Sequence, residues 1–147
     1  MKIHDAYFAG IIDGEGSITL NRTGPHKVDG MWASYTVKLS VANTSRKLLD
    51  ALQAQYGGAI YRAMAQERME LHNQKDAYHL QWFGKNAKPL ILAIQPYLII
   101  KSRQAELALA VIAIQKARKS GVAQSADEVR VIRDMQLEMK ALNKRGR

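Results

Sequence analysis

The sequence predicts an α+β fold with the element order helix–strand–strand–helix–strand–strand–helix, followed by additional helix at the C-terminus. Three observations predict this order. A short glycine-rich segment with helical periodicity opens the chain, two pairs of segments then alternate apolar and polar residues, and residues 101–119 are rich in Ala, Leu and Ile. A length of 147 residues fits one domain, and 47% hydrophobic content suffices for a core.

The first predicted helix covers residues 7–16, Tyr-Phe-Ala-Gly-Ile-Ile-Asp-Gly-Glu-Gly. One face carries apolar residues at i, i+3 and i+4, namely Phe8, Ile11 and Ile12. The opposite face has almost no side chains, because it consists of Ala6, Gly10 and Gly14. Glycine inside a helix costs about 1 kcal/mol relative to alanine. A bare face is therefore best explained by the close approach of a second helix.

Two acidic residues, Asp13 and Glu15, fall at the C-terminal end of this helix. The helix macrodipole disfavours negative charge there. Acids in such a place, beside a face made for close contact, suggest a metal site. The alternative is a helix that ends in Asp-Gly with solvated acids, and the pattern alone leaves both open.

Residues 16–23 and 32–42 alternate in polarity and are predicted to form a hairpin with a buried apolar face and an open polar face. Its loop contains the turn residues Gly24-Pro25 and Asp29-Gly30. A second pair of strands is predicted over residues 59–65 and 77–83, joined by a charged stretch.

Between and after the strands, helices are predicted over residues 46–56, from Asn86 to Pro96, and over residues 101–119. Thr44 or Ser45 can cap the first of them, and Gly57-Gly58 ends it. Residues 1–121 would thus form the core.

The remaining residues, 122–147, are predicted to form a helix and a basic tail that pack on the core. The helix starts at a capping box, Ser125-Ala-Asp-Glu128, and runs to about Asn143. Its apolar stripe consists of Ile132, Met135, Met139 and Leu142. The tail from Lys144 to Arg147 either contacts phosphates or is solvated.

The composition favours a polyanionic partner. There are 22 Lys and Arg against 13 Asp and Glu, which gives a formal charge of +9. A basic protein without a nucleic-acid role is the alternative. The absence of cysteine excludes disulfides and thiolate metal sites, and the four histidines show no ligand spacing.

No membrane association is expected. The longest apolar stretch, around residues 90–100, is interrupted by Gln95 and Pro96 and is unsuited to spanning a bilayer. Residues 1–4 lead directly into the first helix, so no cleavable signal peptide is expected. We expect a soluble, intracellular protein.

The segment FAGIIDGEG, Phe8 to Gly16, resembles the motif of the LAGLIDADG homing endonucleases, and Tyr7 and Ser17-Ile18 fit the same family. The predicted element order is similar to the αββαββα core of that family, in which four antiparallel strands form a saddle-shaped sheet. Only one copy of the motif is present, as in the members that act as homodimers. The resemblance implies a metal-dependent endonuclease without an organic cofactor, which hydrolyses double-stranded DNA at a long pseudo-palindromic site in intron or intein homing.

By the same resemblance, Glu15 is the metal-binding acid, at a position where most members carry Asp, and the Gly14 carbonyl is the second ligand. Mg²⁺ is the expected ion, and Mn²⁺ or Ca²⁺ would fit the same site. Asp13 is expected to hydrogen-bond within a helix pair rather than to bind metal. Pairing of two motif helices would bring two acids together near the symmetry axis. The expected dimer interface consists of Ala6, Gly10, Asp13 and Gly14.

Three further residues take catalytic roles by resemblance. Lys101 would lie near the phosphate and offset developing charge, or else be a solvated lysine at a helix start. Asn43 would position water, and it would also suit a turn or a helix cap. Arg46 would contact a backbone phosphate.

The polar face of the sheet is the surface expected to bind DNA, although a solvated polar face is also typical of any half-buried sheet. Its first-hairpin candidates are Ser17, Thr19, Asn21, Thr23, Ser34, Thr36, Lys38 and Ser40. Its second-hairpin candidates are Arg62, Met64, His79 and Gln81. His26 and Lys27, at the hairpin tip, would reach flanking sequence or phosphates. Such side chains read base edges through donor and acceptor patterns.

Two other functions remain open. One is an intron RNA-binding maturase, and the other is a non-cleaving DNA-binding protein on the same fold. Glu15 and Lys101 favour the nuclease, because an RNA-binding role would not need them.

Overall fold

The computed structural model describes residues 2–23, 34–63, 77–118, 121 and 124–144. Within these ranges the helices are α1 (Asp5–Glu15), α2 (Arg46–Tyr56), α4 (Lys88–Ile94), α5 (Ser102–Ala117) and α6 (Ala126–Asn143), and the short 3-10 helices are η1 (Gly84–Asn86) and η2 (Gln95–Tyr97). The strands are β1 (Gly16–Thr23), β2 (Ser34–Asn43), β3 (Ala59–Arg62) and β4 (Tyr78–Phe83). This order confirms the predicted α+β fold.

Helix α1 buries the face that its periodicity predicts. Phe8 and Ile12 are fully buried, and Ile11 packs against the same core. Ala9 is buried as well. The His4 imidazole caps the helix by accepting a hydrogen bond from the backbone N–H of Ala6 at 3.0 Å. The helix therefore has one anchored side and one bare side.

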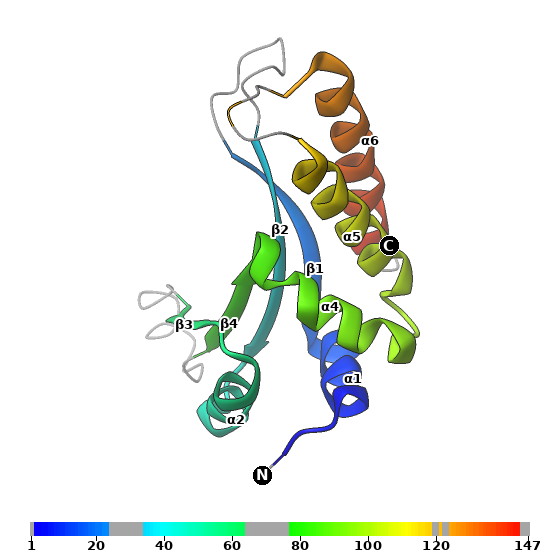
Figure 1. Cartoon of the computed structure of the whole chain (residues 1–147). Coiled ribbons are helices and arrows are strands. Elements are labelled where there is room, and N and C mark those ends of the chain that lie inside the picture. Colours follow the sequence, from blue (N-terminus) through cyan, green and yellow to red (C-terminus); the bar gives the residue numbers. More distant parts are fainter. Residues whose placement is uncertain (1, 24–33, 64–76, 119–120, 122–123, 145–147) are drawn as a thin grey trace.

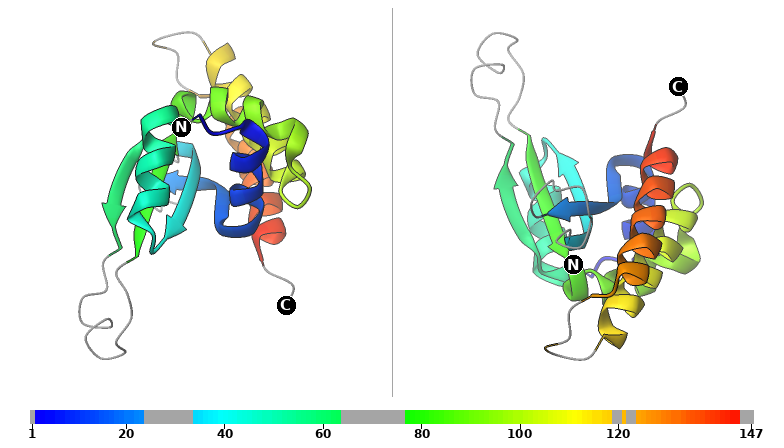
Figure 2. Two further views of the ribbon diagram at one scale, coloured as in Figure 1. Left: turned by 90° about the horizontal axis from the view of Figure 1, so that it is seen from below. Right: turned by 90° about the horizontal axis from the view of Figure 1, so that it is seen from above.

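Four described strands form a single antiparallel sheet in the order β1-β2-β4-β3. Alternate residues of β1, β2 and β4 are buried, so one face of the sheet packs on the core and the other is open. Helices α1, α5 and α6 lie to one side of the sheet (Figures 1 and 2). The opposite face, which is formed mainly by β1, β2 and β4, carries the polar side chains.

A tight turn connects α2 to β3, as the two glycines predict. Gly57 and Gly58 have φ of 72° and 93°, a region that favours glycine. A Cβ on Gly58 would lie 2.6 Å from the indole nitrogen of Trp82. That nitrogen donates to the Tyr56 carbonyl at 3.1 Å. The second strand pair is thereby fastened to the end of α2.

Tyr56 joins α2 to the start of α1. Its ring stacks on Phe8 with centroids 4.5 Å apart, and its hydroxyl donates to the Asp5 carboxylate at 3.0 Å. Burial and the neighbouring Asp5 raise the pKa of Tyr56 to about 12. The phenol thus stays protonated and keeps its donor role over the physiological pH range.

Helix α6 lies beside α5 and covers the edge strand β1 (Figure 1). Ile132 and Met139 are buried and Met135 packs against them, as predicted, whereas Leu142 is 40% exposed, contrary to the prediction. Gln136, which the predicted stripe did not include, is buried instead. Its amide donates to the Leu20 carbonyl of β1 at 3.1 Å. Polar side chains of α6 thereby satisfy backbone acceptors of an edge strand.

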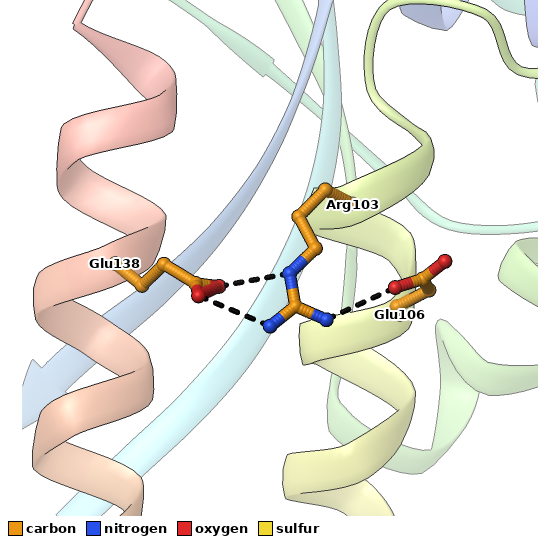
Figure 3. Close-up of polar contacts among 3 residues, drawn as sticks. All are labelled: Arg103, Glu106 and Glu138. Atoms are coloured by element: carbon orange, nitrogen blue, oxygen red, sulfur yellow. Dashed lines mark hydrogen bonds and ion pairs between the residues drawn. The ribbon is translucent and has the colours of Figure 1, made fainter.

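Arg103 of α5 joins the two C-terminal helices at the surface. Its guanidinium makes two contacts of 3.0 Å with Glu138 of α6 and one of 3.0 Å with Glu106 (Figure 3). All three side chains are about half exposed, and such surface pairs stabilise folds only weakly. The buried apolar residues of α6 therefore hold it in place.

Several predicted features lie outside the described residues: the turn residues between β1 and β2, the end of the predicted strand beyond residue 63, and the tail beyond Lys144. The described helices include none with the length and apolar character needed to cross a bilayer.

Candidate functional site

Glu15, the last residue of α1, meets Asn43, the last residue of β2. The Asn43 amide donates to the Glu15 carboxylate at 2.5 Å. The amide oxygen of Asn43 accepts from the backbone N–H of Ser45 at 2.7 Å, and Ser45 in turn caps α2. Asn43 thus has the turn role that its sequence context suggests and also orients the exposed carboxylate of Glu15.

Asp13 makes several hydrogen bonds within its own chain. Its carboxylate accepts from the backbone N–H groups of Ile99, Ile100 and Lys101 at 2.7, 3.2 and 3.0 Å. These groups lead into the N-terminus of α5, where negative charge is favoured. The expectation that Asp13 also bonds within a helix pair stays a prediction, because it concerns a second chain. The negative charge of Asp13 is disfavoured by the dipole of α1, at whose C-terminal end it lies. It is favoured by the dipole of α5, whose N-terminal end it contacts.

The side chain of Lys101 also bonds to Asp13, in the opposite direction. Its ammonium donates to the Asp13 carbonyl at 2.6 Å, and the residue is partly buried at the start of α5. A cation at the C-terminal end of α1 is stabilised by the helix dipole. Lys101 is therefore a fixed side chain at the end of the glycine-rich helix and not a solvated lysine.

A cleft of about 410 Å³ opens at this point. It lies between the end of α1, the start of β1, the start of α5 and the end of α6. Its lining includes two cations, Lys101 and Lys144, one acid, Asp13, and the open-face residues Ser17 and Thr19. The cleft therefore connects the polar face of the sheet to the end of α1, and its walls carry two cations and one acid whose carboxylate is bonded to backbone N–H groups.

The described part of one chain contains no group of three His, Cys, Asp or Glu side chains that would hold a metal. The donors that the end of α1 offers are the Glu15 carboxylate and the Gly14 carbonyl, which belongs to the last helical turn. Both are oxygen donors, as Mg²⁺ and Ca²⁺ prefer. One carboxylate suits an ion that takes its other ligands from a second chain, from a phosphate and from water.

Arg46 is engaged away from the cleft. Its guanidinium bonds Asp50 at 2.8 Å and lies 5.3 Å from the ring centroid of Tyr78. The side chain is about half exposed. A phosphate contact by Arg46 would have to compete with these two partners.

The strand register decides which residues share the open face. Cross-strand pairs lie on the same face, and Ser17 pairs with Ser40 while Lys38 lies between Thr19 and Phe83. The predicted residues that the register places on this face are Ser17, Thr19, Asn21, Ser34, Thr36, Lys38, Ser40, His79 and Gln81. Ser40 is buried and shares a 3.3 Å hydrogen bond with Ser17.

The prediction that Arg62 lies on the open face is wrong. Arg62 pairs with Tyr78, which lies on the helix-covered face, so Arg62 is not on the open face. Tyr61, which the sequence reasoning missed, pairs with His79 there and is 52% exposed. The relative register of β3 and β4 decides this, and polarity alone does not reveal it.

The remaining predicted DNA-binding residues, His26, Lys27 and Met64, lie outside the described residues, as does the side chain of Thr23.

The bare face of α1 is exposed in the single chain. Ala6, Gly10 and Gly14 are all exposed, and a Cβ on either glycine would meet no atom within 4 Å. Large apolar side chains, which the sequence reasoning also missed, accompany this helix: Tyr7, Tyr97, Ile99 and Ile100. Ile99 and Ile100 are 86% and 69% exposed, although their backbone is bound to Asp13 of α1.

The sequence matches no family model and no curated protein. Solved structures do match. The homing endonuclease I-CvuI in complex with its target, in the presence of 2 mM Ca, gives a TM-score of 0.74 at 19% identity, covering 95% of this chain and 82% of that one. An archaeal intron-encoded homing endonuclease, I-Vdi141I, complexed with DNA, gives 0.75 at 16% identity, covering 97% and 86%.

A third match is the LAGLIDADG homing endonuclease I-GzeII in complex with its DNA target. Its TM-score is 0.69 at 16% identity, over 92% of this chain but only 44% of that one. This chain therefore spans more than four fifths of the first two structures and less than half of the third. It has the LAGLIDADG homing endonuclease fold.

Proposed function

We propose that this chain is a homodimeric, metal-dependent endonuclease that hydrolyses phosphodiester bonds of double-stranded DNA at a long pseudo-palindromic site. The observation that carries the proposal is that two contacts gather at the end of α1: Asn43 bonds to the Glu15 carboxylate, and the Lys101 ammonium bonds to the Asp13 carbonyl two residues earlier. Glu15, Asn43 and Lys101 are far apart in the sequence, and each was assigned a catalytic role from the motif or its context. The DNA-bound relatives with this fold support the proposal.

The DNA would lie on the open face of the sheet. This face is lined by short polar side chains and by Lys38, and it leads into the cleft with Lys101 and Lys144. A chain charge of +9 makes the whole molecule attractive to a polyanion. The many Ser and Thr residues suit water-bridged contacts to bases.

A divalent ion, Mg²⁺ or Ca²⁺, would be held by Glu15 and the Gly14 carbonyl. When bound, such an ion activates water and stabilises negative charge on phosphate oxygens. The protein groups have their own tasks. Asn43 fixes the orientation of the Glu15 carboxylate, Lys101 offsets negative charge near the phosphate, and Lys144 attracts the DNA backbone.

Two chains complete the site. The bare face of α1 lets a second α1 approach closely, and exposed Ile99, Ile100 and Tyr97 would be covered by the same partner. An exposed apolar patch beside a smooth helix face is typical of an association surface. Pairing two α1 helices would bring two Glu15 carboxylates close enough to serve the two strands of one duplex.

The test uses the DNA junction that flanks the gene, in its uninterrupted form, carried on a supercoiled plasmid with Mg²⁺. The unmutated chain is expected to linearise the plasmid. Glu15→Gln keeps the shape of the side chain but removes its charge, so it should bind the same DNA and cut it more slowly by roughly 100- to 1,000-fold, the loss typical of removing one electrostatic stabiliser.

Asp134→Asn is the matched control, because it removes one exposed carboxylate from α6, away from the cleft. It should cut at the unmutated rate. If the unmutated chain binds the duplex without cutting, it is a DNA-binding protein instead. If it prefers the intron RNA to the duplex, the maturase function holds.

A further inference from the structure

The bare face of α1 is too small to hold two chains together by itself. The helix has 11 residues. A helix of that length is about 16 Å long and about 10 Å wide, so contact along one face covers on the order of 200 Å² of each chain. A stable interface covers about 800 Å² of each partner. The surfaces on both sides of α1 must therefore also take part in the dimer.

One side of α1 carries an apolar ridge, formed by Tyr97, Ile99 and Ile100. Among the described residues, no other large apolar side chain is as exposed as these two isoleucines, at 86% and 69%. Their backbone is fixed, because the Asp13 carboxylate accepts hydrogen bonds from the N–H groups of Ile99 and Ile100. An exposed apolar ridge on a fixed backbone is typical of an association surface.

The other side of α1 carries a groove of about 510 Å³ between α1 and α2. Ile3 and Tyr7 line it at the start of the chain, and Leu48 and Ala51 line it from α2. Its remaining lining residues are Lys2, His4, Ser45 and Lys47. A groove with apolar walls and no acid in its lining suits an apolar segment and disfavours a cationic one.

Helical geometry places the ridge and the groove on opposite sides of the bare face. Successive residues of an α-helix are about 100° apart, so the positions three before and three after Gly10 lie about 60° to either side of it. These positions are Tyr7, which lines the groove, and Asp13, which holds the ridge. In Figures 1 and 2, α2 lies on one side of α1, and the chain that leads into α5 lies on the other.

Symmetry then decides what each surface meets. Two Glu15 carboxylates come together only if the two α1 helices run side by side in the same direction, because Glu15 ends the helix. The two-fold axis of such a pair runs along the helices, and it places the ridge of each chain opposite the groove of its partner. With the helices in opposite directions, ridge would face ridge and the two acids would lie apart.

We propose that Ile99 and Ile100 of each chain insert into the groove between α1 and α2 of a second copy of this chain. The inference rests on the proposed function and specifies the surfaces that form its dimer. The bare faces of α1 meet at the centre, and one ridge-in-groove contact lies on each side of them.

This contact also connects the two cleavage sites. Ile100 directly precedes Lys101 in the sequence. In the partner, Ser45 of the groove donates its backbone N–H to Asn43, which bonds to Glu15. Insertion therefore holds the segment that carries Lys101 of one chain close to the turn that orients Glu15 of the other.

Cysteine cross-linking tests the contact, because the chain contains no cysteine of its own. Chains with Ile100→Cys and chains with Leu48→Cys are co-expressed, placed on the uncut junction duplex with Ca²⁺, and treated with a short bis-maleimide. The mixture should give a covalent dimer on a denaturing gel, and each variant alone should give none. Leu137→Cys, at an exposed position of α6, is the control and should give none with Leu48→Cys.

Ile100→Ala measures how much the contact contributes. The side chain is exposed within its own chain, so the circular dichroism spectrum should not change. Each dimer loses the contact twice, so its dissociation constant in sedimentation should rise by roughly 100-fold or more. Leu137→Ala removes a similarly exposed side chain from α6 and should leave the dissociation constant unchanged.

The outcomes separate this inference from the proposed function. If Ile100→Cys cross-links to itself, ridge faces ridge and the inference is wrong. If no pair cross-links, or if Ile100→Ala dimerises as tightly as the unmutated chain while two chains still bind and cut each duplex, another surface forms the dimer and the proposed function stands. If the unmutated chain binds as a monomer or fails to cut, the proposed function is contradicted and the inference falls with it.

Discussion

At the scale of single residues, the end of α1 is organised by reciprocal contacts between two helix ends. The Asp13 carboxylate accepts three backbone N–H groups ahead of α5, and the Lys101 ammonium donates to a carbonyl of α1. Each charge satisfies the dipole of the other helix. This pairing leaves Glu15 as the exposed acid at the end of α1, which supports our proposal that Glu15, rather than Asp13, holds the metal.

Substitutions of two basic residues, one on each face of the sheet, test whether DNA binds the open face. Lys38 lies on the open face between Thr19 and Phe83, whereas Arg62 lies on the other face. Removing either costs one positive charge, so a general electrostatic effect is the same for both. Lys38→Ala should weaken binding of the target duplex by roughly tenfold or more, as expected for one base contact, and Arg62→Ala should weaken it far less. Fluorescence anisotropy at fixed salt measures both.

If Arg62→Ala weakened binding as much as Lys38→Ala does, the DNA would not lie on the face that the register defines.

Residue-level prediction from the sequence succeeded where alternation within one strand was enough. Serine, threonine and asparagine of β1 fall on the open face because period-2 patterning is local. Arg62 was assigned to the wrong face and Tyr61 was missed, because the face of each depends on pairing with β4. The burial of Gln104 was missed for a similar reason, since its side chain contacts Asn143, which lies 39 positions away in the sequence.

At the scale of elements, α1 is the decisive helix. Its core-facing side is filled by Phe8 and Ile12, while its other side carries no bulk at Gly10 and Gly14. Helices with small side chains on one face can approach each other closely, and here the exposed apolar residues around η2 and the start of α5 border that face. We therefore propose that α1 makes two contacts, one with its own core and one with a second chain.

Gly10→Leu tests this directly. A side chain at position 10 meets no atom of its own chain, and leucine is a better helix former than glycine by somewhat less than 1 kcal/mol. The variant should fold with equal or higher stability, remain monomeric in sedimentation, and lose DNA cutting. Ala54→Leu adds a leucine to an exposed position of α2 and should leave association and cutting unchanged.

A Gly10→Leu chain that sedimented as a dimer and still cut DNA would show that the bare face of α1 has no role in association.

Elements with strong local patterns were predicted well. Helix α2 matches its predicted bounds, and Ser45 and Gly57 mark its ends as expected. Helix α6 was placed correctly, but Leu142 was assigned to its buried stripe, where the structure buries Gln136. Hydrophobic periodicity predicts which face of a helix is covered. It does not show that carbonyls of a neighbouring edge strand favour a buried amide on that face.

At the scale of the whole molecule, charge and shape act together. Each chain carries +9, so two chains carry +18. The described helices occupy one side of the sheet, and none of them covers its other side (Figure 2). The sequence predicted the fold at this scale because element order and the motif are local properties. The geometry of a dimer involves atoms of a second chain, and sequence predicts it only through the bare face that the second chain would need.

The central claim is that two identical chains act on one duplex through the end of α1. The most direct measurement is the native mass of the purified protein on its uncut target duplex with Ca²⁺. The account predicts a complex of two 16.5 kDa chains per duplex, and one chain per duplex when Gly10→Leu is used. A single unmutated chain on a fully bound duplex would contradict it.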